Sequence, residues 1–312
     1  MNIQQFQYVL AVVDLRNFEA AAEKCFVTQS TLSTMIGKFE EEIGVQIFNR
    51  KTKPVSITHE GAQIIERLRI LAKEVDSLKN LIQELKNEQE GELRIGVIPT
   101  VAPYLLPLFL TTFTKAFPKL KVVLMEATTA EIISSLNHRT LDVGILAVPL
   151  HEENLVEIHL YYEPFLVYDC TLSKRKKFTT AEALDYTKLW LMEEGHCLST
   201  QVKKICDLSH KHSEKPLNIE FRAASMDSLL KFTKANLGIT IVPYLAANDL
   251  QGENETKVVA FAEPTPTRNI SLVTHQHFVK KKLLKELQQI IQQAVAPHIP
   301  AVGKEKKVIK PI

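Results

Sequence analysis

Hydrophobic residues near the start of the chain recur at the spacing of short amphipathic helices. The pattern predicts one helix from Ile3, a second over 18–25 capped by Asn17, and a third that starts at Thr28 or Gln29. The third helix has one apolar face, formed by Leu32, Ile36 and Phe39. Two short helices with small residues where they cross, and a polar first turn on the second, are typical of a helix-turn-helix. Residues 48–58 are rich in basic side chains and predict a short β-wing.

A narrower apolar stripe runs through residues 60–88. Its members alternate at spacings of four and three residues: Ile64, Leu68, Leu71, Val75, Leu78, Ile82 and Leu85. This heptad pattern with a polar remainder is typical of a coiled-coil seam, so we expect a long helix that pairs with a second copy. The alternative is that the stripe packs on its own domain.

The pattern changes after Gly91 to alternating strands and helices. Strands are predicted at 93–98, 121–125 and 143–148, with helices from Val101 and over 130–137. Further strand–helix stretches are expected at 189–206 and 219–235, before a strand at 238–243. Such alternation favours an α/β domain with mainly parallel strands.

These patterns divide the chain into four parts. We expect a winged helix-turn-helix domain over 1–59, a coiled-coil linker helix over 60–90, an α/β regulatory domain over 91–300 and a disordered, lysine-rich tail over 301–312.

Composition narrows the class of protein. The chain has 312 residues, 45% of them hydrophobic, and a net charge of +2, so bulk charge does not indicate nucleic-acid binding. It lacks an apolar run of the roughly 18–20 residues that span a bilayer and a signal-peptide pattern, so we expect a cytoplasmic protein without membrane contact. The motifs of metal sites, phosphate loops and hydrolases are missing from the sequence. We expect no cofactor, no bound metal and no enzymatic activity.

The N-terminal motifs resemble those of LysR-type transcription regulators. The resemblance is carried by residues 17–22, residues 27–33 and the Phe48-Asn49-Arg50 triplet. It implies that the third helix enters the major groove of double-stranded DNA, with seven contacting residues: Gln29, Ser30, Ser33, Thr34, Lys38, Arg50 and Lys51. The family usually has proline where this chain has Ser30 and a basic residue where it has Thr34.

Downstream motifs resemble the peroxide-sensing OxyR branch of that family. They are the segments 96–107, 195–198, 221–229 and 238–243. The resemblance implies a regulatory domain of two Rossmann-like subdomains, of the periplasmic-binding-protein type. It also implies a dimer of dimers that binds an inverted-repeat operator and contacts RNA polymerase.

The same resemblance assigns a redox pair, Cys197 and Cys206, and a peroxide-binding set, namely Thr100, Thr129, His196 and Arg268. A sensing thiol reacts as a thiolate, which a nearby positive charge favours. Relatives often carry arginine two residues after the sensing cysteine, where this chain has Ser199. Cys25 and Cys170 are interpreted as packing residues.

The pair also implies a conformational switch. Nine residues of helix would separate the two α-carbons by about 13 Å, whereas a disulfide joins α-carbons roughly 4–7 Å apart. We therefore expect a regulator in which hydrogen peroxide oxidises Cys197, a disulfide forms with Cys206, and the change in oligomer geometry alters transcription of oxidative-stress genes. Two alternatives stay open. One is a LysR-type regulator that binds a small organic effector between its subdomains, and the other is a thiol peroxidase.

Overall fold

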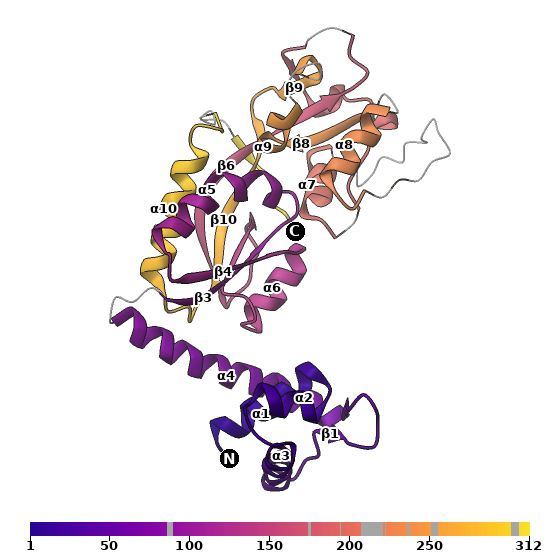
Figure 1. The fold of residues 1–312 in the computed structure, drawn as a ribbon. Helices are drawn as coiled ribbons and strands as arrows, with labels where there is room; N and C mark the ends of the chain where they lie inside the picture. Colours follow the sequence, from indigo (N-terminus) through magenta and orange to yellow (C-terminus); the bar gives the residue numbers. More distant parts are fainter. Residues whose placement is uncertain are drawn as a thin grey trace. The chain divides into compact units, whose positions relative to one another are not determined.

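The chain folds into two compact units, Met1–Glu88 and Gln89–Ile312 (Figure 1). The computed structural model describes residues 1–85, 90–173, 176–193, 195–206, 221, 223–235, 238–250, 255–300 and 306–312. Each unit has its own hydrophobic core, because the apolar residues of each are buried among themselves.

The first unit begins with three short helices, α1 (Ile3–Leu15), α2 (Phe18–Lys24) and α3 (Gln29–Ile43). Side-chain caps define their starts. The Asn17 side chain accepts from the first turn of α2, and Thr28 accepts from the backbone of α3. α3 ends at Gly44, whose φ of 69° lies in the left-handed region that glycine tolerates. The three predicted helices are confirmed, with the start of α3 capped by Thr28.

A two-stranded wing and a long helix complete this unit. Strands β1 (Phe48–Asn49) and β2 (Ser56–Ile57) pair antiparallel, as the basic segment predicted. Helix α4 spans His59–Leu85. Its Leu68 is buried in the core of the unit, so the first part of the apolar stripe packs on its own domain. Leu71, Leu78 and Ile82 are exposed, so the described residues leave these later positions of the stripe largely open to solvent.

The second unit is built on one curved sheet. Its strands are β3 (Gly91–Val97), β4 (Leu120–Glu126), β5 (Val143–Val148), β6 (Leu155–Asp169), β7 (Phe178–Thr179), β8 (Ile239–Pro243), β9 (Val258–Phe261), β10 (Thr265–His275) and β11 (Lys306–Val308). The order is β4-β3-β5-β10-β6-β9-β7, with β8 on β6 and β11 on β10. Strand β6 runs through both halves of the unit, pairing antiparallel with β10 in one half and with β8 and β9 in the other.

Helices cover the sheet and divide the unit into two subdomains. They are α5 (Ala102–Ala116), α6 (Thr129–Asn137), α7 (Cys197–Cys206), α8 (Met226–Ala235), α9 (Tyr244–Ala247) and α10 (Lys281–Val295). Residues of α5, α6 and α10 bury apolar side chains in one core, whereas most of α7 and α8 packs in a second core. The arrangement confirms the predicted regulatory domain of two α/β subdomains.

Three details of the prediction were wrong. The sheet is mixed rather than mainly parallel, because β10 and β6 pair antiparallel with each other and with their other main partners β5, β8 and β9. Leu189 and Met192 form only isolated bridges, not a strand. Residues 306–312 are not a disordered tail, since β11 adds to the sheet and Ile309 after it is buried. Residues 301–305 of that tail, and the start of the stretch expected at 219–235, lie outside the described residues.

Candidate functional site

Cys197 lies where the two cores of the second unit meet. It is the first residue of α7 and follows Gly195, whose φ of 99° permits the sharp entry into the helix. The Cys197 side chain packs in the first core, while Leu198 and Val202 of the same helix pack in the second. The reactive candidate therefore lies at the junction of the subdomains and is buried.

A buried arginine reaches this junction from β10. Arg268 is 1% exposed and donates from Nη1 to Thr100 Oγ1 at 2.9 Å and from Nη2 to the Thr100 carbonyl at 3.1 Å. Its other contacts are with Glu163 Oε2, at 2.9 Å from Nε and 2.8 Å from Nη2. Glu163 is fully buried, and its Oε1 accepts from the Leu245 backbone. Each charge is thus paired and hydrogen-bonded, the condition under which buried charges are tolerated.

The cluster sets the ionisation of the cysteine. Burial raises the pKa of the Cys197 thiol, because low-polarity surroundings disfavour the thiolate. The Arg268 charge and then the Thr129 hydroxyl act in the opposite direction and lower that pKa. Burial dominates, so the resting thiol is more protonated than an exposed one. Arg268 supplies the positive charge that Ser199 does not.

The remaining predicted residues divide into those inside and those outside this cluster. Thr129 is buried. Apart from its interaction with the Cys197 thiol, its hydroxyl has no hydrogen-bond partner among the described residues. It is therefore available to the thiol or to a small polar ligand. His196 contributes its carbonyl oxygen, which accepts from Ser199 N at 3.0 Å, while its half-exposed ring forms no hydrogen bond to the described side chains. The structure thus brings together Cys197, Thr129, Thr100 and Arg268, without the His196 ring.

Cys206 is the last residue of α7, buried at the far end of the helix. None of the four cysteines forms a disulfide, and the segment between Cys197 and Cys206 is helical throughout. The helical rise places their α-carbons about 13 Å apart, too far for a disulfide. Cys170 is buried in the second core, and burial raises its pKa, as expected of a packing residue.

Glu163 is a site residue that sequence reasoning missed. It lies within the otherwise apolar centre of β6, where an isolated carboxylate needs a cationic partner. That signal was present in the sequence, but the partner lies 105 residues away and only the pairing of β6 with β10 identifies it.

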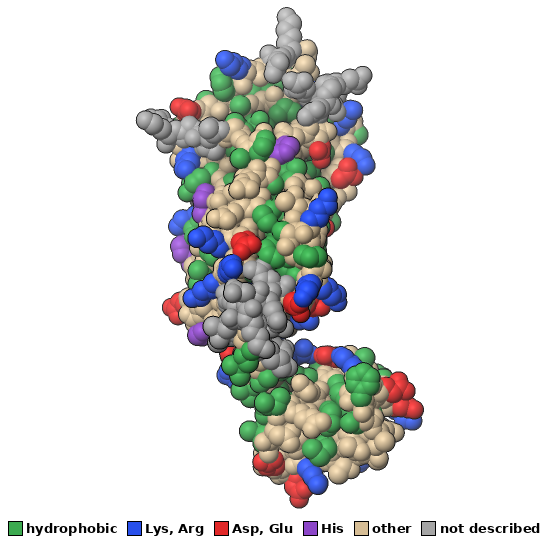
Figure 2. Space-filling model, turned by 60° about the vertical axis from the view of Figure 1, so that its left-hand side comes forward, with side chains coloured by type: hydrophobic (Ala, Val, Ile, Leu, Met, Phe, Trp, Pro, Cys, Tyr) green, Lys and Arg blue, Asp and Glu red, His purple; other side chains and the backbone are tan. Residues whose placement is uncertain are grey.

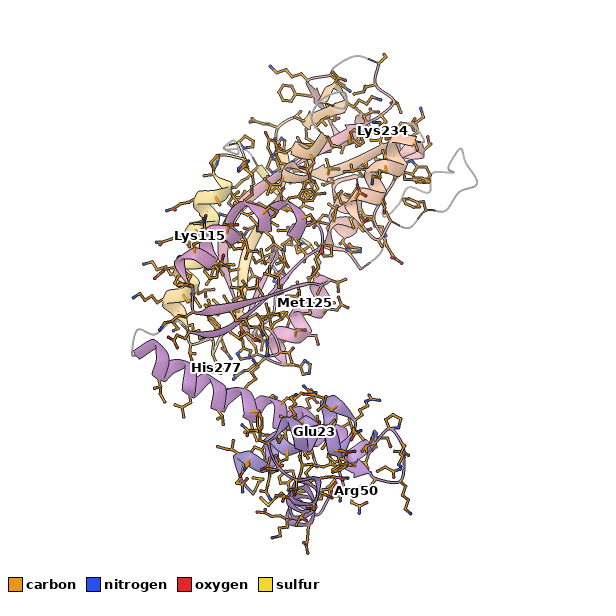
Figure 3. The ribbon with its side chains drawn as sticks, viewed as in Figure 1. Glu23, Arg50, Lys115, Met125, Lys234 and His277 are labelled. Atoms are coloured by element: carbon orange, nitrogen blue, oxygen red, sulfur yellow. The ribbon has the colours of Figure 1, made fainter. Side chains whose placement is uncertain are left out.

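A cavity of about 700 Å³ opens beside this cluster. Pro99, Pro103 and Tyr104 line one side, and residues of α8 line another, including Lys231 and Lys234. Lys234 is labelled on α8 in Figure 3. Burial, with the nearby Asp249 and Asp227 carboxylates, raises the pKa of Tyr104 to about 12, so its hydroxyl stays protonated and can donate a hydrogen bond. The cavity can hold a small polar molecule.

The predicted DNA contacts lie on α3 and the wing. Gln29, Ser30, Thr34 and Lys38 are exposed on α3, and Ser33 is half-buried. Phe26, in the turn before the helix, is almost fully exposed and has a positive φ of 56°. Helix α3 is the second helix of the helix-turn-helix motif, and an exposed polar face on that helix is the arrangement that reads a major groove.

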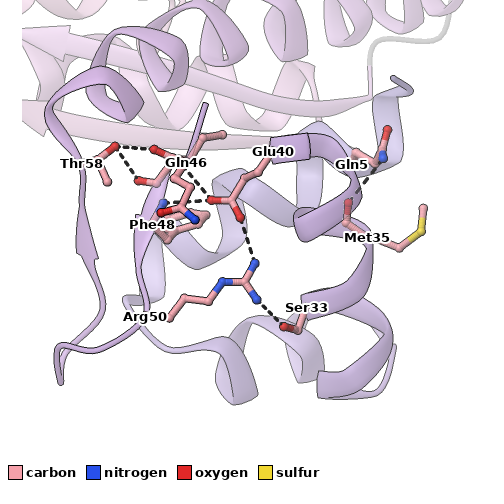
Figure 4. A network of polar contacts seen from close by, with 9 residues as sticks. Gln5, Ser33, Met35, Glu40, Gln46, Phe48, Arg50 and Thr58 are labelled. Atoms are coloured by element: carbon pink, nitrogen blue, oxygen red, sulfur yellow. Dashed lines mark hydrogen bonds and ion pairs between the residues drawn. The ribbon is translucent and has the colours of Figure 1, made fainter. Parts of the chain in front are cut away.

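Arg50 is held within the domain (Figure 4). Its guanidinium donates to Ser33 Oγ and to Glu40 Oε2, both at 2.9 Å, and lies over the Phe18 ring. Glu40 is buried, and its Oε1 accepts from the backbone of Ile47 and Phe48. Arg50 and Ser33, both predicted to contact DNA, therefore also connect the wing to α3, while Lys51 is exposed.

The described helices include none that is both long and apolar enough to cross a membrane.

Comparisons with known proteins decide the family. Residues 86–296 match the LysR substrate binding domain, and residues 3–62 match the bacterial regulatory helix-turn-helix protein, lysR family. The chain belongs to the LysR family. Family members of this kind are DNA-binding regulators rather than enzymes, in agreement with the expected class.

Several relatives of this LysR-type regulator carry names that refer to hydrogen peroxide or to OxyR. A hydrogen peroxide-inducible genes activator of Dickeya chrysanthemi is 34% identical over 88% of this chain and 89% of its own length. The DNA-binding transcriptional dual regulator OxyR of Escherichia coli K12 is 32% identical over 98% of this chain and 99% of its own. The structure of a full-length OxyR variant from Pseudomonas aeruginosa matches with a TM-score of 0.75 and 26% identity, covering 94% of this chain and 98% of that one.

Proposed function

We propose that this LysR-type regulator senses hydrogen peroxide through Cys197 and transmits the signal by forming a disulfide with Cys206. The observation that carries the proposal is the buried cluster of Cys197, Thr129, Thr100 and Arg268 at the start of a helix that ends in the second cysteine. The names of the relatives, an OxyR protein and a hydrogen peroxide-inducible genes activator, support a response to hydrogen peroxide.

The chemistry needs only this cluster, the Cys206 thiol at the other end of α7 and one peroxide molecule. The Cys197 thiolate attacks one peroxide oxygen, the O–O bond breaks, and the leaving hydroxide takes up a proton to become water. Cys197 is then a sulfenic acid. The Cys206 sulfur attacks the Cys197 sulfur, the S–O bond breaks, and a second water leaves with the thiol proton of Cys206. One peroxide is reduced and two thiols are oxidised to one disulfide.

The reacting groups have separate tasks in this proposal. The Thr129 hydroxyl is placed to hold the peroxide beside the thiol, because its oxygen is buried and lacks another good partner. Arg268 stabilises the thiolate, and Thr100 fixes the guanidinium through its hydroxyl and carbonyl oxygens. A low polarity around the sulfur makes that single charge more effective than it would be in water.

Disulfide formation must unwind α7. The α-carbons of Cys197 and Cys206 have to approach by roughly 6 Å or more, which a helix cannot allow. Cys197 packs in the first core, whereas the other buried apolar residues of α7 pack in the second. Refolding of α7 therefore changes the junction between the subdomains. We propose that this change alters the geometry of a dimer of dimers and thereby transcription at an inverted-repeat operator, with contact to RNA polymerase.

The exposed later part of the α4 stripe supports the dimer. Leu71, Leu78 and Ile82 lie at heptad spacing and stay open to solvent in the single chain. A second copy of α4 would cover them. Two recognition helices would then face successive major-groove segments of the operator.

A second candidate function is regulation by a small organic effector. The cavity of about 700 Å³ beside Tyr104 and α8 favours it, because its size suits a metabolite and its lining mixes lysine, carboxylate and tyrosine groups. In that case the response would not depend on Cys197.

One experiment separates the two candidates. The reduced protein is treated with one equivalent of peroxide and analysed by mass spectrometry within seconds, beside Cys197→Ser and Cys206→Ser. We expect a loss of two hydrogens and a peptide linking Cys197 to Cys206 in the original chain, and in neither Cys197→Ser nor Cys206→Ser. Cys170→Ser is the matched control, since this buried thiol should leave the reaction unchanged. Peroxide that leaves both cysteines reduced would reject the sensing function.

A further inference from the structure

The C-terminal residues 306–312 attach to the strand that carries Arg268. Strand β11 pairs parallel with β10, with Lys306 opposite Thr265 and Val308 opposite Thr267. The backbone N–H of Ile309 donates to the Thr267 carbonyl at 2.7 Å, which extends the pairing to the residue before Arg268. This segment is therefore anchored beside the redox cluster.

The same segment also binds the redox helix α7. Gln201 is fully buried, and its Nε2 donates to the Ile309 carbonyl at 2.9 Å. The Lys204 ammonium group donates to the backbone oxygens of Lys310 and Ile312. The Ile309 side chain, 4% exposed, lies in the second core with the buried face of α7. One segment thus connects α7 to β10 by backbone pairing, two side-chain contacts and one apolar anchor.

These contacts depend on the helical form of α7. Gln201 and Lys204 lie four and seven residues after Cys197, so they share one helical face with it. They are also between the two cysteines, in the part of the chain that has to unwind for a disulfide. An unwound α7 cannot keep both side chains on the docked segment.

We propose that residues 306–312 form a latch that holds α7 helical in the reduced protein and restrains the condensation of Cys206 with oxidised Cys197. The inference rests on the proposed function, because it concerns the second step of that reaction. A segment that binds only the helical form shifts the equilibrium toward that form, and the disulfide in turn weakens the docking of the segment. Oxidation therefore releases the latch.

A small cavity beside the latch is consistent with its release. About 230 Å³ of space lies between Ile205, Lys307, Ile309 and the end of β9. The residue next to Cys206 therefore borders space rather than a fully packed wall. This space gives the side chain of Ile205 room to shift once the latch is released.

The test compares two aspartate substitutions one residue apart. Ile309→Asp places a charge in the core and detaches the latch, whereas Val308→Asp alters a side chain that is 38% exposed. Lys204→Met is a second variant that removes the outer attachment without touching the core. Each full-length chain is treated with peroxide, and mass spectrometry follows the sulfenic acid and the disulfide separately over time.

We expect sulfenic acid formation to stay within about twofold in all three variants. Disulfide formation from the sulfenic acid should accelerate by at least roughly tenfold in Ile309→Asp and by roughly threefold in Lys204→Met, with no change in Val308→Asp. Hydrogen exchange of the reduced proteins gives an independent readout. Amides of 198–206 should exchange faster in Ile309→Asp than in Val308→Asp.

Different results overturn the two proposals. If the original chain forms the disulfide but Ile309→Asp and Lys204→Met condense no faster, the latch is refuted and the sensing function stands. Unchanged exchange of α7 in Ile309→Asp would refute the latch as well. If the original chain forms no disulfide, the sensing function fails and the latch has no step to restrain.

Discussion

Replacing Arg268 with methionine should strongly destabilise the second unit. Methionine fills much of the same space, but it removes the cation that pairs with Glu163, which is 0% exposed. Among the described residues, the carboxylate would keep its hydrogen bond from the Leu245 backbone and no other. Thr100 would lose the donor to its hydroxyl and to its carbonyl oxygen.

The magnitude follows from leaving one buried charge unpaired. Breaking such a pair from one side costs about 3–5 kcal/mol in the free energy of unfolding. A typical domain is stable by roughly 5–15 kcal/mol, so Arg268→Met would lose a large part of its stability. An exposed ion pair offers a matched control. Arg94 pairs with Glu92 at the surface, and Arg94→Met should cost less than about 1 kcal/mol.

The assay is urea unfolding followed by tryptophan fluorescence. Trp190 is the single tryptophan of the chain and is buried in the second core, so its signal reports on this unit. With an m-value of about 2–3 kcal/mol/M, Arg268→Met should lower the midpoint by about 1–2 M. The double variant Arg268→Met, Glu163→Gln removes both charges and should recover part of the loss.

The reasoning would be refuted by either of two results. One is a midpoint for Arg268→Met that falls no further than that of Arg94→Met. The other is a double variant whose loss equals the sum of the losses for Arg268→Met and Glu163→Gln, because a paired charge requires strong coupling between the two sites.

Three further predictions concern the thiol, the wing and the linker helix. Because burial raises the pKa of Cys197, its rate of reaction with peroxide or iodoacetamide should still be rising at pH 9, which stopped-flow measurements of the reduced protein can check; a plateau near pH 7 would contradict this. Arg50→Gln should weaken DNA binding severalfold with an unchanged salt slope if Arg50 mainly positions the wing, whereas loss of a direct phosphate contact would reduce that slope by about one. Leu78 is 59% exposed, so Leu78→Glu should not prevent folding. It should shift the protein to smaller assemblies in sedimentation, and an unchanged mass would contradict the proposed coiled-coil seam.

The local sequence determined the elements of the first unit. Asn17 and Thr28 cap α2 and α3 through bonds to backbone groups two or three residues away, so nothing distant is needed to place them. The strand at Val143–Val148 was also predictable, because a continuous apolar run between polar turns is typical of a strand buried on both faces. The helical form of 197–206, the basis of the proposed switch, likewise agrees with the prediction.

Tertiary structure decided the direction of the strands and the fate of the C-terminal segment. Strand direction depends on which segments meet across the sheet, and β6 and β10 are about a hundred residues apart. The lysine-rich composition of the tail suggested disorder, yet residues 306–308 pair with β10 and the side chain of Ile309 is buried in the second core with residues of α7. Composition describes only the segment itself, whereas docking depends on a surface that other parts of the chain form.

The electrostatics of the site also depended on the fold. The motifs pointed to Cys197 and Arg268, but they did not indicate whether the thiol would be activated or suppressed. That balance depends on burial at the junction of two cores and on the Glu163 carboxylate that pairs with the arginine. Because Coulomb and desolvation energies vary with distance and surroundings, residue identity alone cannot specify them.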